Sequence, residues 1–110
     1  KANMPRSVPM TTRVRTIIDR RMETRDKLFP YDGTWIRTKW TRLRNNMQMH
    51  ADPQFVPHML RHTCASRLVQ AGATIPVVQQ WLGHKTIAMT MRYAHLAPSN
   101  LADAVKLLEK

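Results

Sequence analysis

The sequence predicts a mainly α-helical fold that begins with a small β-hairpin remnant. Apolar residues recur every three or four positions in several stretches, which is the period of an amphipathic helix. Proline and glycine separate these stretches, and only the first ten residues have the pattern of a turn followed by a short strand. With 110 residues, 43% of them apolar, the chain can form one domain with a modest core.

Residues 1–10 are expected to form the end of the hairpin, in which Pro9 limits the strand to the edge of a sheet. Thr11 or Thr12 then caps a first helix. After a group of turn residues, a second helix is expected over about 34–49. The inward-facing apolar stripes of the two helices are Val14, Ile17, Ile18 and Met22 in the first, and Ile36, Trp40, Leu43 and Met47 in the second.

A third helix is expected from Pro57 or His58 to Gly72, because proline fits a first turn and glycine fits the position after a helix end. A short fourth helix follows, which Thr74 caps and Gly83 closes.

A fifth helix over about 86–93 completes a helical core that spans residues 11–96. The remaining residues, 97–110, form a tail with apolar residues at helical spacing, namely Leu101, Val105 and Leu108.

The chain carries 18 basic and 7 acidic residues, a net charge of +11. This excess favours a polyanionic partner, of which nucleic acid is the common case, although a basic surface that only aids solubility is an alternative. No stretch approaches the roughly 20 apolar residues of a membrane span, so we expect no membrane partner. The single cysteine, Cys64, fits a reducing cytoplasm.

His58 and Arg61 stand three residues apart, on nearly the same side of the expected third helix. The planar fork of arginine matches two phosphate oxygens, and histidine holds a phosphate oxygen or moves a proton. His62 has metal-ligand spacing from His58, but no cysteine pair or carboxylate cluster accompanies the two. We therefore expect no metal site, and a structural His62 bonded to a backbone carbonyl or a neighbouring helix.

His84 follows a glycine at a helix end, and Tyr93 lies nine residues later. Each has an ordinary structural interpretation, His84 as a cation near the negative end of a helix dipole and Tyr93 as a half-buried aromatic. A tyrosine hydroxyl becomes a nucleophile, however, when cations and a proton acceptor lie close to it. Together with Lys1, His58 and Arg61, this is the mixture of groups that phosphodiester cleavage without a metal would require.

The order of these motifs resembles the tyrosine recombinases, the bacteriophage-type integrases. Residues 58–63 read H-x-x-R-H-T, residues 82–84 read L-G-H, and residues 90–95 read T-M-R-Y-A-H. The first nine residues resemble the hairpin of that family, with a lysine in its turn. The resemblance implies a tyrosine recombinase catalytic-domain-like fold. It also implies site-specific DNA recombination or integration without a cofactor, for a prophage or genomic island.

The resemblance also implies a role for each residue. Tyr93 resembles the nucleophile that attacks the scissile phosphate and forms a 3′-phosphotyrosyl link. Arg61 resembles an arginine that binds the non-bridging oxygens, and His58 and His84 resemble the pocket histidines that hold the phosphate and assist proton transfer. Lys1 resembles the hairpin lysine that protonates the leaving 5′-oxygen.

In the family, a further catalytic arginine and an N-terminal DNA-clamping domain precede the hairpin. We therefore expect this chain to be the C-terminal portion of a catalytic domain, truncated at its N-terminus. We also expect it to be inactive alone, because it would lack one of the cations that bind the phosphate.

Double-stranded DNA attachment sites are the expected substrate, with accessory DNA-bending proteins as further partners and the bacterial nucleoid as the location. The candidate DNA contacts, for which a solvated basic face is the alternative, are Arg37, Arg42, Arg44 and Lys85. The resemblance also implies self-association into a synaptic assembly through residues 97–110. The apolar stripe of this tail would equally allow it to fold back on its own core.

A non-catalytic helix-turn-helix DNA-binding module is the alternative function. Residues 72–92 have the pattern of a helix, a turn and a second helix with basic residues. This alternative explains the charge but not the joint presence of the histidines, Arg61 and Tyr93. A metal-dependent nuclease is a weaker alternative, since it needs carboxylates that the sequence does not group.

Overall fold

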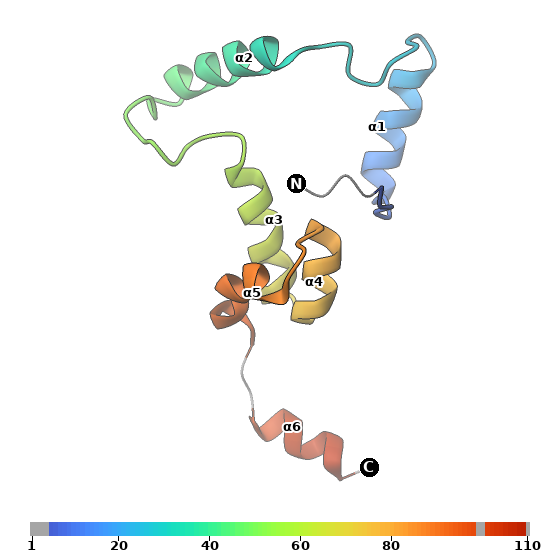
Figure 1. Cartoon of the computed structure of the whole chain (residues 1–110), viewed down its shortest axis with the longest axis vertical. Helices are drawn as coiled ribbons and strands as arrows, with labels where there is room; N and C mark the ends of the chain where they lie inside the picture. Colours follow the sequence, from blue (N-terminus) through green and yellow to red (C-terminus); the bar gives the residue numbers. More distant parts are fainter. Residues whose placement is uncertain (1–4, 99–100, 110) are drawn as a thin grey trace. The chain divides into compact units, whose positions relative to one another are not determined.

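The computed structural model describes residues 5–98 and 101–109, and every regular element within them is a helix (Figure 1). The prediction of a mainly helical fold is therefore confirmed. The chain divides into two compact units, one over Pro5–Pro57 and the other from His58 onward.

The predicted β-hairpin remnant is not found in the part of it that the structure describes. Residues 5–10 form neither strand nor helix. Pro5 and Pro9 remove two backbone N–H donors from these six residues, and the described residues contain no second strand for them to pair with. The expected turn, with Lys1, lies outside the described residues.

The first unit contains two helices, α1 (Thr12–Met22) and α2 (Gly33–Asn46). Thr11 caps α1 as predicted, because its Oγ1 accepts a hydrogen bond from the Val14 N–H at 3.2 Å. Asp32 caps α2 in the same way, accepting from the Trp35 N–H at 2.9 Å. The second helix therefore begins close to its predicted start and ends three residues before its predicted end at 49.

The predicted inward stripes of α1 and α2 are largely not buried, which corrects the sequence analysis. Six of their eight residues are between 40% and 51% exposed: Val14, Ile17, Met22, Ile36, Leu43 and Met47. Phe55 is buried in this unit, where the Trp40 Nε1–H donates to its carbonyl oxygen at 2.8 Å. The two rings also lie 5.2 Å apart, so Trp40 fastens the loop after α2 to that helix.

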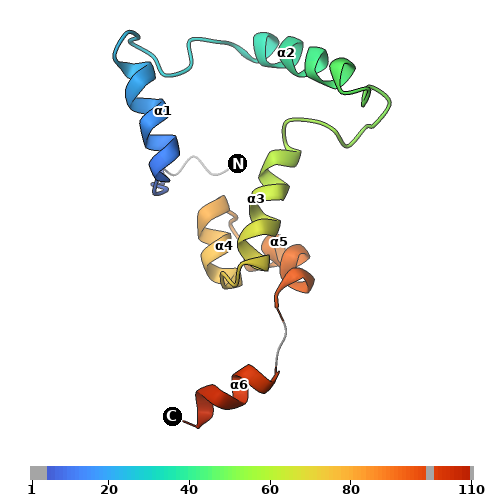
Figure 2. The ribbon, with the colours of Figure 1, turned by 180° about the vertical axis from the view of Figure 1, so that it is seen from behind.

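The second unit is built from α3 (Met59–Gln70), α4 (Ile75–Leu82), α5 (Ile87–Thr90) and the 3₁₀ helix η1 (Met91–Leu96). Figures 1 and 2 show α3, α4 and α5 side by side from opposite directions. The single fifth helix predicted over 86–93 is instead α5 followed by η1, since 3₁₀ turns commonly tighten the end of a short helix.

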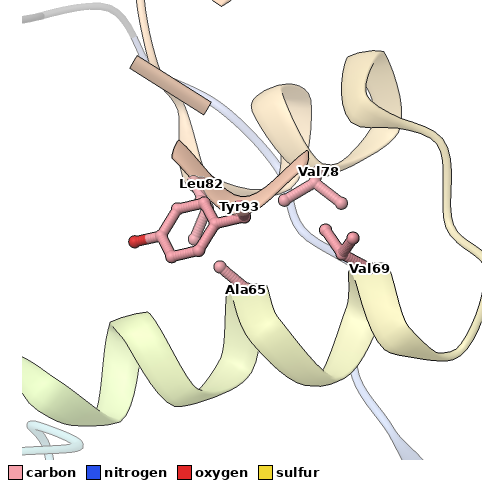
Figure 3. Packing of buried hydrophobic residues seen from close by; sticks show 5 residues of the cluster. All are labelled: Ala65, Val69, Val78, Leu82 and Tyr93. Atoms are coloured by element: carbon pink, nitrogen blue, oxygen red, sulfur yellow. The ribbon is translucent and has the colours of Figure 1, made fainter. Parts of the chain in front are cut away.

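The core of the second unit is a small apolar cluster (Figure 3). It joins α3, α4 and η1 through five buried residues: Ala65, Val69, Val78, Leu82 and Tyr93. Trp81 packs against this cluster. The cluster therefore fixes η1, and with it Tyr93, on the inner side of α3.

The tail forms α6 (Leu101–Leu108), as its apolar spacing predicts. All its side chains are exposed. Among the described residues, no helix has the length and apolar content needed to cross a membrane.

Candidate active site

Helix α3 presents three polar residues to one pocket. His58 is the N-cap residue of α3, and Arg61 and His62 follow at three and four positions, so all three lie on one side of the helix. His58 is exposed, whereas Arg61 and His62 are half-buried. The predicted pairing of His58 with Arg61 on one helix side is found.

The end of α4 delivers His84 to the same pocket. Gly83 ends the helix with a left-handed backbone conformation, φ +74°, which glycine adopts without steric cost. The His84 N–H then donates to the Gln79 carbonyl oxygen at 3.1 Å, and the Gln79 side-chain amide donates to the His84 carbonyl oxygen at 3.3 Å. These contacts hold the His84 backbone directly after the turn.

Helix η1 supplies Arg92 and Tyr93. The ring of Tyr93 is one of the five buried core residues, and its hydroxyl points out of the cluster in Figure 3. The Arg92 guanidinium lies over this ring at 5.6 Å from its centroid, within the range of a cation–π contact. A buried ring with an outward hydroxyl has little freedom to move, which favours a defined position for the oxygen.

The side chains from these three elements line one pocket of about 670 Å³. Its lining is His58, Arg61, His62, His84, Ala88, Met89, Arg92 and Tyr93. Four predicted site residues therefore lie together, namely His58, Arg61, His84 and Tyr93. The pocket also brings His62 to Tyr93, which is 31 positions away in the sequence. The fifth, Lys1, lies outside the described residues.

Two hydrogen bonds orient the side chains of Arg61 and His84 in the pocket. Arg61 donates from Nη2 to the Leu82 carbonyl oxygen at the end of α4. His84 Nδ1 is hydrogen-bonded at 2.7 Å to Oγ1 of Thr90, a fully buried residue. Because Nδ1 of His84 is engaged in this way, Nε2 is the ring nitrogen left for a ligand.

The Tyr93 hydroxyl is hydrogen-bonded to His62 Nδ1 at 2.5 Å. Of the two partners expected for His62, a backbone carbonyl or a neighbouring helix, the structure gives the second, because Tyr93 belongs to η1. The adjacent His58 ring lies edge-on to His62, with the ring centroids 5.0 Å apart. The His62 ring thus lies between the rings of His58 and Tyr93.

The electrostatics of the pocket favour the neutral forms of His62 and His84. Partial burial lowers the pKa of His62 below its ordinary value, and the positive charges of Arg92, His58 and Arg61 lower it further. Partial burial also lowers the pKa of His84, with Arg61 and Arg92 acting in the same direction. A neutral imidazole can accept a proton, whereas the two arginines stay charged and attract an anion.

Sequence reasoning missed His62 and Arg92 as pocket residues. The motif order contained both, since His62 follows Arg61 directly and Arg92 precedes Tyr93. The available signal was adjacency to predicted site residues, but helix spacing alone does not show which neighbour turns toward the pocket.

The four candidate DNA contacts differ in their surroundings. Arg37, Arg42 and Lys85 are exposed. Arg44 is half-buried and donates from Nη2 to the carbonyl oxygens of His50 and Asp52, at 3.0 and 2.7 Å. Its guanidinium therefore also binds the backbone of the loop after α2.

No metal cluster is apparent in the part of the chain that the structure describes. None of its histidine, cysteine, aspartate and glutamate side chains gather in threes at a distance that could hold a metal ion.

Comparison with known proteins places the chain among the integrases and tyrosine recombinases. The family model described as the phage integrase family matches residues 1–100. An integrase of Escherichia phage 186 is 60% identical over 50 residues, which are 46% of this chain and 15% of that protein. An integrase of Escherichia phage P2 is 36% identical over 110 residues, covering 97% of this chain and 30% of that protein.

A tyrosine recombinase of Thermosipho africanus is 29% identical over 120 residues, covering 98% of this chain and 40% of that protein. The chain thus spans less than half the length of each of these relatives. The family match, which extends over most of the chain, confirms the resemblance: the chain belongs to the phage integrase family of tyrosine recombinases.

Proposed function

We propose that the protein takes part in site-specific DNA recombination, cutting and rejoining DNA through a 3′-phosphotyrosyl intermediate. The observation that carries this proposal is the pocket that places the Tyr93 hydroxyl together with Arg61, His58 and His84. The names of the relatives, integrase and tyrosine recombinase, support the same reaction class. Integration of a prophage or genomic island is the form of recombination that we favour.

In this mechanism the pocket binds one DNA phosphate. Arg61 holds the non-bridging oxygens, and the fixed positive charge stabilises the negative charge that builds on them in the transition state. His58 and the free Nε2 of His84 hold the phosphate and assist proton transfer. The orientation of His84 by Thr90 supports this role, because the hydrogen bond leaves Nε2 available.

The Tyr93 oxygen attacks the phosphorus and displaces the 5′-oxygen of the next nucleotide. A Tyr93–phosphorus bond forms as the phosphorus–O5′ bond breaks, and the leaving oxygen takes up a proton. The resemblance gives this last task to Lys1. The covalent link keeps the energy of the broken bond, so rejoining requires no ATP.

Several wider features belong to the same proposal. Residues 11–96 would form the helical catalytic core, with Arg37, Arg42, Arg44 and Lys85 as DNA contacts. Residues 97–110 would link protomers in a synaptic assembly, because α6 is amphipathic and its side chains are exposed. With double-stranded DNA attachment sites as its substrate, the protein would work at the bacterial nucleoid, with accessory DNA-bending proteins as partners.

A non-catalytic helix-turn-helix module is not favoured by these findings. Residues 72–92 do contain two short helices joined by a turn, but the family match covers the whole segment. Such a module also gives no reason for a tyrosine, three histidines and two arginines to share one pocket.

The test is cleavage of nicked attachment-site DNA by the full-length gene product. The unaltered protein should form a DNA-linked species on a denaturing gel, and Tyr93→Phe should abolish it while DNA binding stays almost unchanged. Tyr31→Phe is the matched control, because Tyr31 lies in the other unit and should keep the adduct. If Tyr93→Phe still yields the adduct, the proposed function is wrong.

A further inference from the structure

We propose that His62 is the general base that takes the proton of the Tyr93 hydroxyl during strand cleavage. The inference rests on the proposed function, since it assigns a step within that reaction. Its starting observation is the hydrogen bond between the Tyr93 hydroxyl and His62 Nδ1 at 2.5 Å. A general base must lie within hydrogen-bond reach of the proton it removes, and His62 does.

The other two histidines of the pocket are placed for different tasks. His84 Nδ1 is occupied by Thr90 Oγ1. His58 is exposed and faces the His62 ring edge-on at 5.0 Å rather than the phenol. Among the described residues, His62 is the hydrogen-bond partner that the structure gives to the Tyr93 hydroxyl. The geometry therefore puts His62, rather than His84 or His58, against the Tyr93 hydroxyl.

The charges around His62 suit a base that acts when DNA is bound. Partial burial and the charges of Arg92, His58 and Arg61 lower the pKa of His62, so the ring is neutral and ready to accept a proton at neutral pH. The same cations would oppose the imidazolium that forms. A bound phosphodiester brings one negative charge to the two arginines and offsets this opposition, which couples proton transfer to the presence of substrate.

The step balances without an oxidant or reductant. The Tyr93 oxygen forms a bond to phosphorus, its proton moves to His62 Nδ1, and the phosphorus–O5′ bond breaks. The 5′-oxygen takes a proton from the acid of the proposed mechanism. In the rejoining step the 5′-hydroxyl returns its proton to that acid as its oxygen bonds to phosphorus. The phosphorus–Tyr93 oxygen bond then breaks, and His62 returns its proton to the Tyr93 oxygen.

The experiment compares His62→Asn with His95→Asn in the full-length gene product. Asparagine can accept a hydrogen bond from the Tyr93 hydroxyl but cannot take its proton, so the ring position is supported while the base is lost. His95 is the matched control, because it is an exposed histidine of η1, the 3₁₀ helix that also carries Tyr93. We expect His62→Asn to slow covalent cleavage of nicked DNA by about 10²–10⁴-fold, the usual contribution of general base catalysis, and His95→Asn to leave it unchanged.

A second measurement separates a base from a merely structural histidine. Replacing Tyr93 with a fluorinated tyrosine makes the phenol more acidic, so it needs less help to lose its proton. Fluorotyrosine should recover most of the cleavage lost in His62→Asn if His62 is the base. If His62 only positions the ring, the fluorinated phenol should recover nothing, and that result would overturn the inference.

The remaining outcomes distinguish this inference from the proposed function. If Tyr93→Phe abolishes the adduct but His62→Asn cleaves at the normal rate, the His62 inference fails and the proposed function stands. If Tyr93→Phe keeps the adduct, both fail. Should His62→Asn lose DNA binding, His62→Gln replaces it, and cleavage at the normal rate by that variant would equally overturn the role of His62.

Discussion

The small core that holds Tyr93 can be tested with two neighbouring valines of α4. Val78 is fully buried in the cluster with Tyr93, whereas Val77 on the same helix is 51% exposed. Val78→Ala and Val77→Ala remove the same two methyl groups and change helix propensity by the same amount. The difference between the two variants therefore isolates burial.

The size of the effect follows from the exposure of each side chain. Removing two buried methyl groups costs about 1.6 kcal/mol in transfer free energy, and the cavity raises the loss at Val78 to about 2–3 kcal/mol. Half that transfer term, about 0.8 kcal/mol, applies to Val77 because half of its surface is already in water. Alanine recovers about 0.5 kcal/mol of helix propensity in both variants. The expected losses are about 1.5–2.5 kcal/mol for Val78→Ala and about 0.3 kcal/mol for Val77→Ala.

The assay is urea denaturation, monitored by the fluorescence of Trp81, which packs against this cluster. Trp35 and Trp40 are replaced by phenylalanine, so that the fluorescence signal comes from this unit alone. The free energy of unfolding should fall clearly in Val78→Ala and remain nearly unchanged in Val77→Ala. Equal losses in the two variants would refute the packing of α4 on α3 and η1 described above.

Three further predictions concern the same unit and its neighbour. Thr90→Val removes the hydroxyl that orients His84, so cleavage should fall by about 10-fold or more with DNA binding retained; an unchanged cleavage rate would contradict the positioning role. The folded-state pKa values of His62 and His84 are lowered, so the unfolded chain binds more protons than the folded one. The free energy of unfolding should therefore decrease as the pH falls from 6.5 through the lowered folded-state pKa values. Coinciding denaturation curves above and within this pH range would refute this. Gly72→Ala should cost about 1–2 kcal/mol because its φ of +101° is strained for alanine, whereas Gly33→Ala in the first turn of α2 should be neutral or stabilising; equal thermal shifts would contradict it.

The sequence predicted the parts of the site that depend on local periodicity. His58 and Arg61 share a helix side because three residues make nearly one turn, and His84 follows a helix end because Gly83 can adopt a positive φ. Thr11 was one of two predicted caps for the same kind of reason, since the capping hydrogen bond joins residues three positions apart. The family resemblance added the expectation that Tyr93 would join them.

The features that the sequence did not predict depend on contacts between distant residues. The partner of His62 is 31 positions away, so it is decided by how η1 packs on α3. The stripes of α1 and α2 have helical spacing, yet spacing indicates only that a face is apolar, and most of that face is exposed in this unit. The hairpin failed because a strand requires a partner, which residues 5–10 lack among the described residues.

The most direct test of the account is to identify the residue that becomes linked to DNA. The full-length gene product is trapped on nicked attachment-site DNA, digested with protease and nuclease, and the nucleotide-bearing peptide is sequenced by mass spectrometry. We expect a 3′-nucleotide on the hydroxyl of Tyr93 and a free 5′-hydroxyl on the released strand. A nucleotide on Tyr31 or on any other side chain, or a 5′-linked nucleotide, would contradict it.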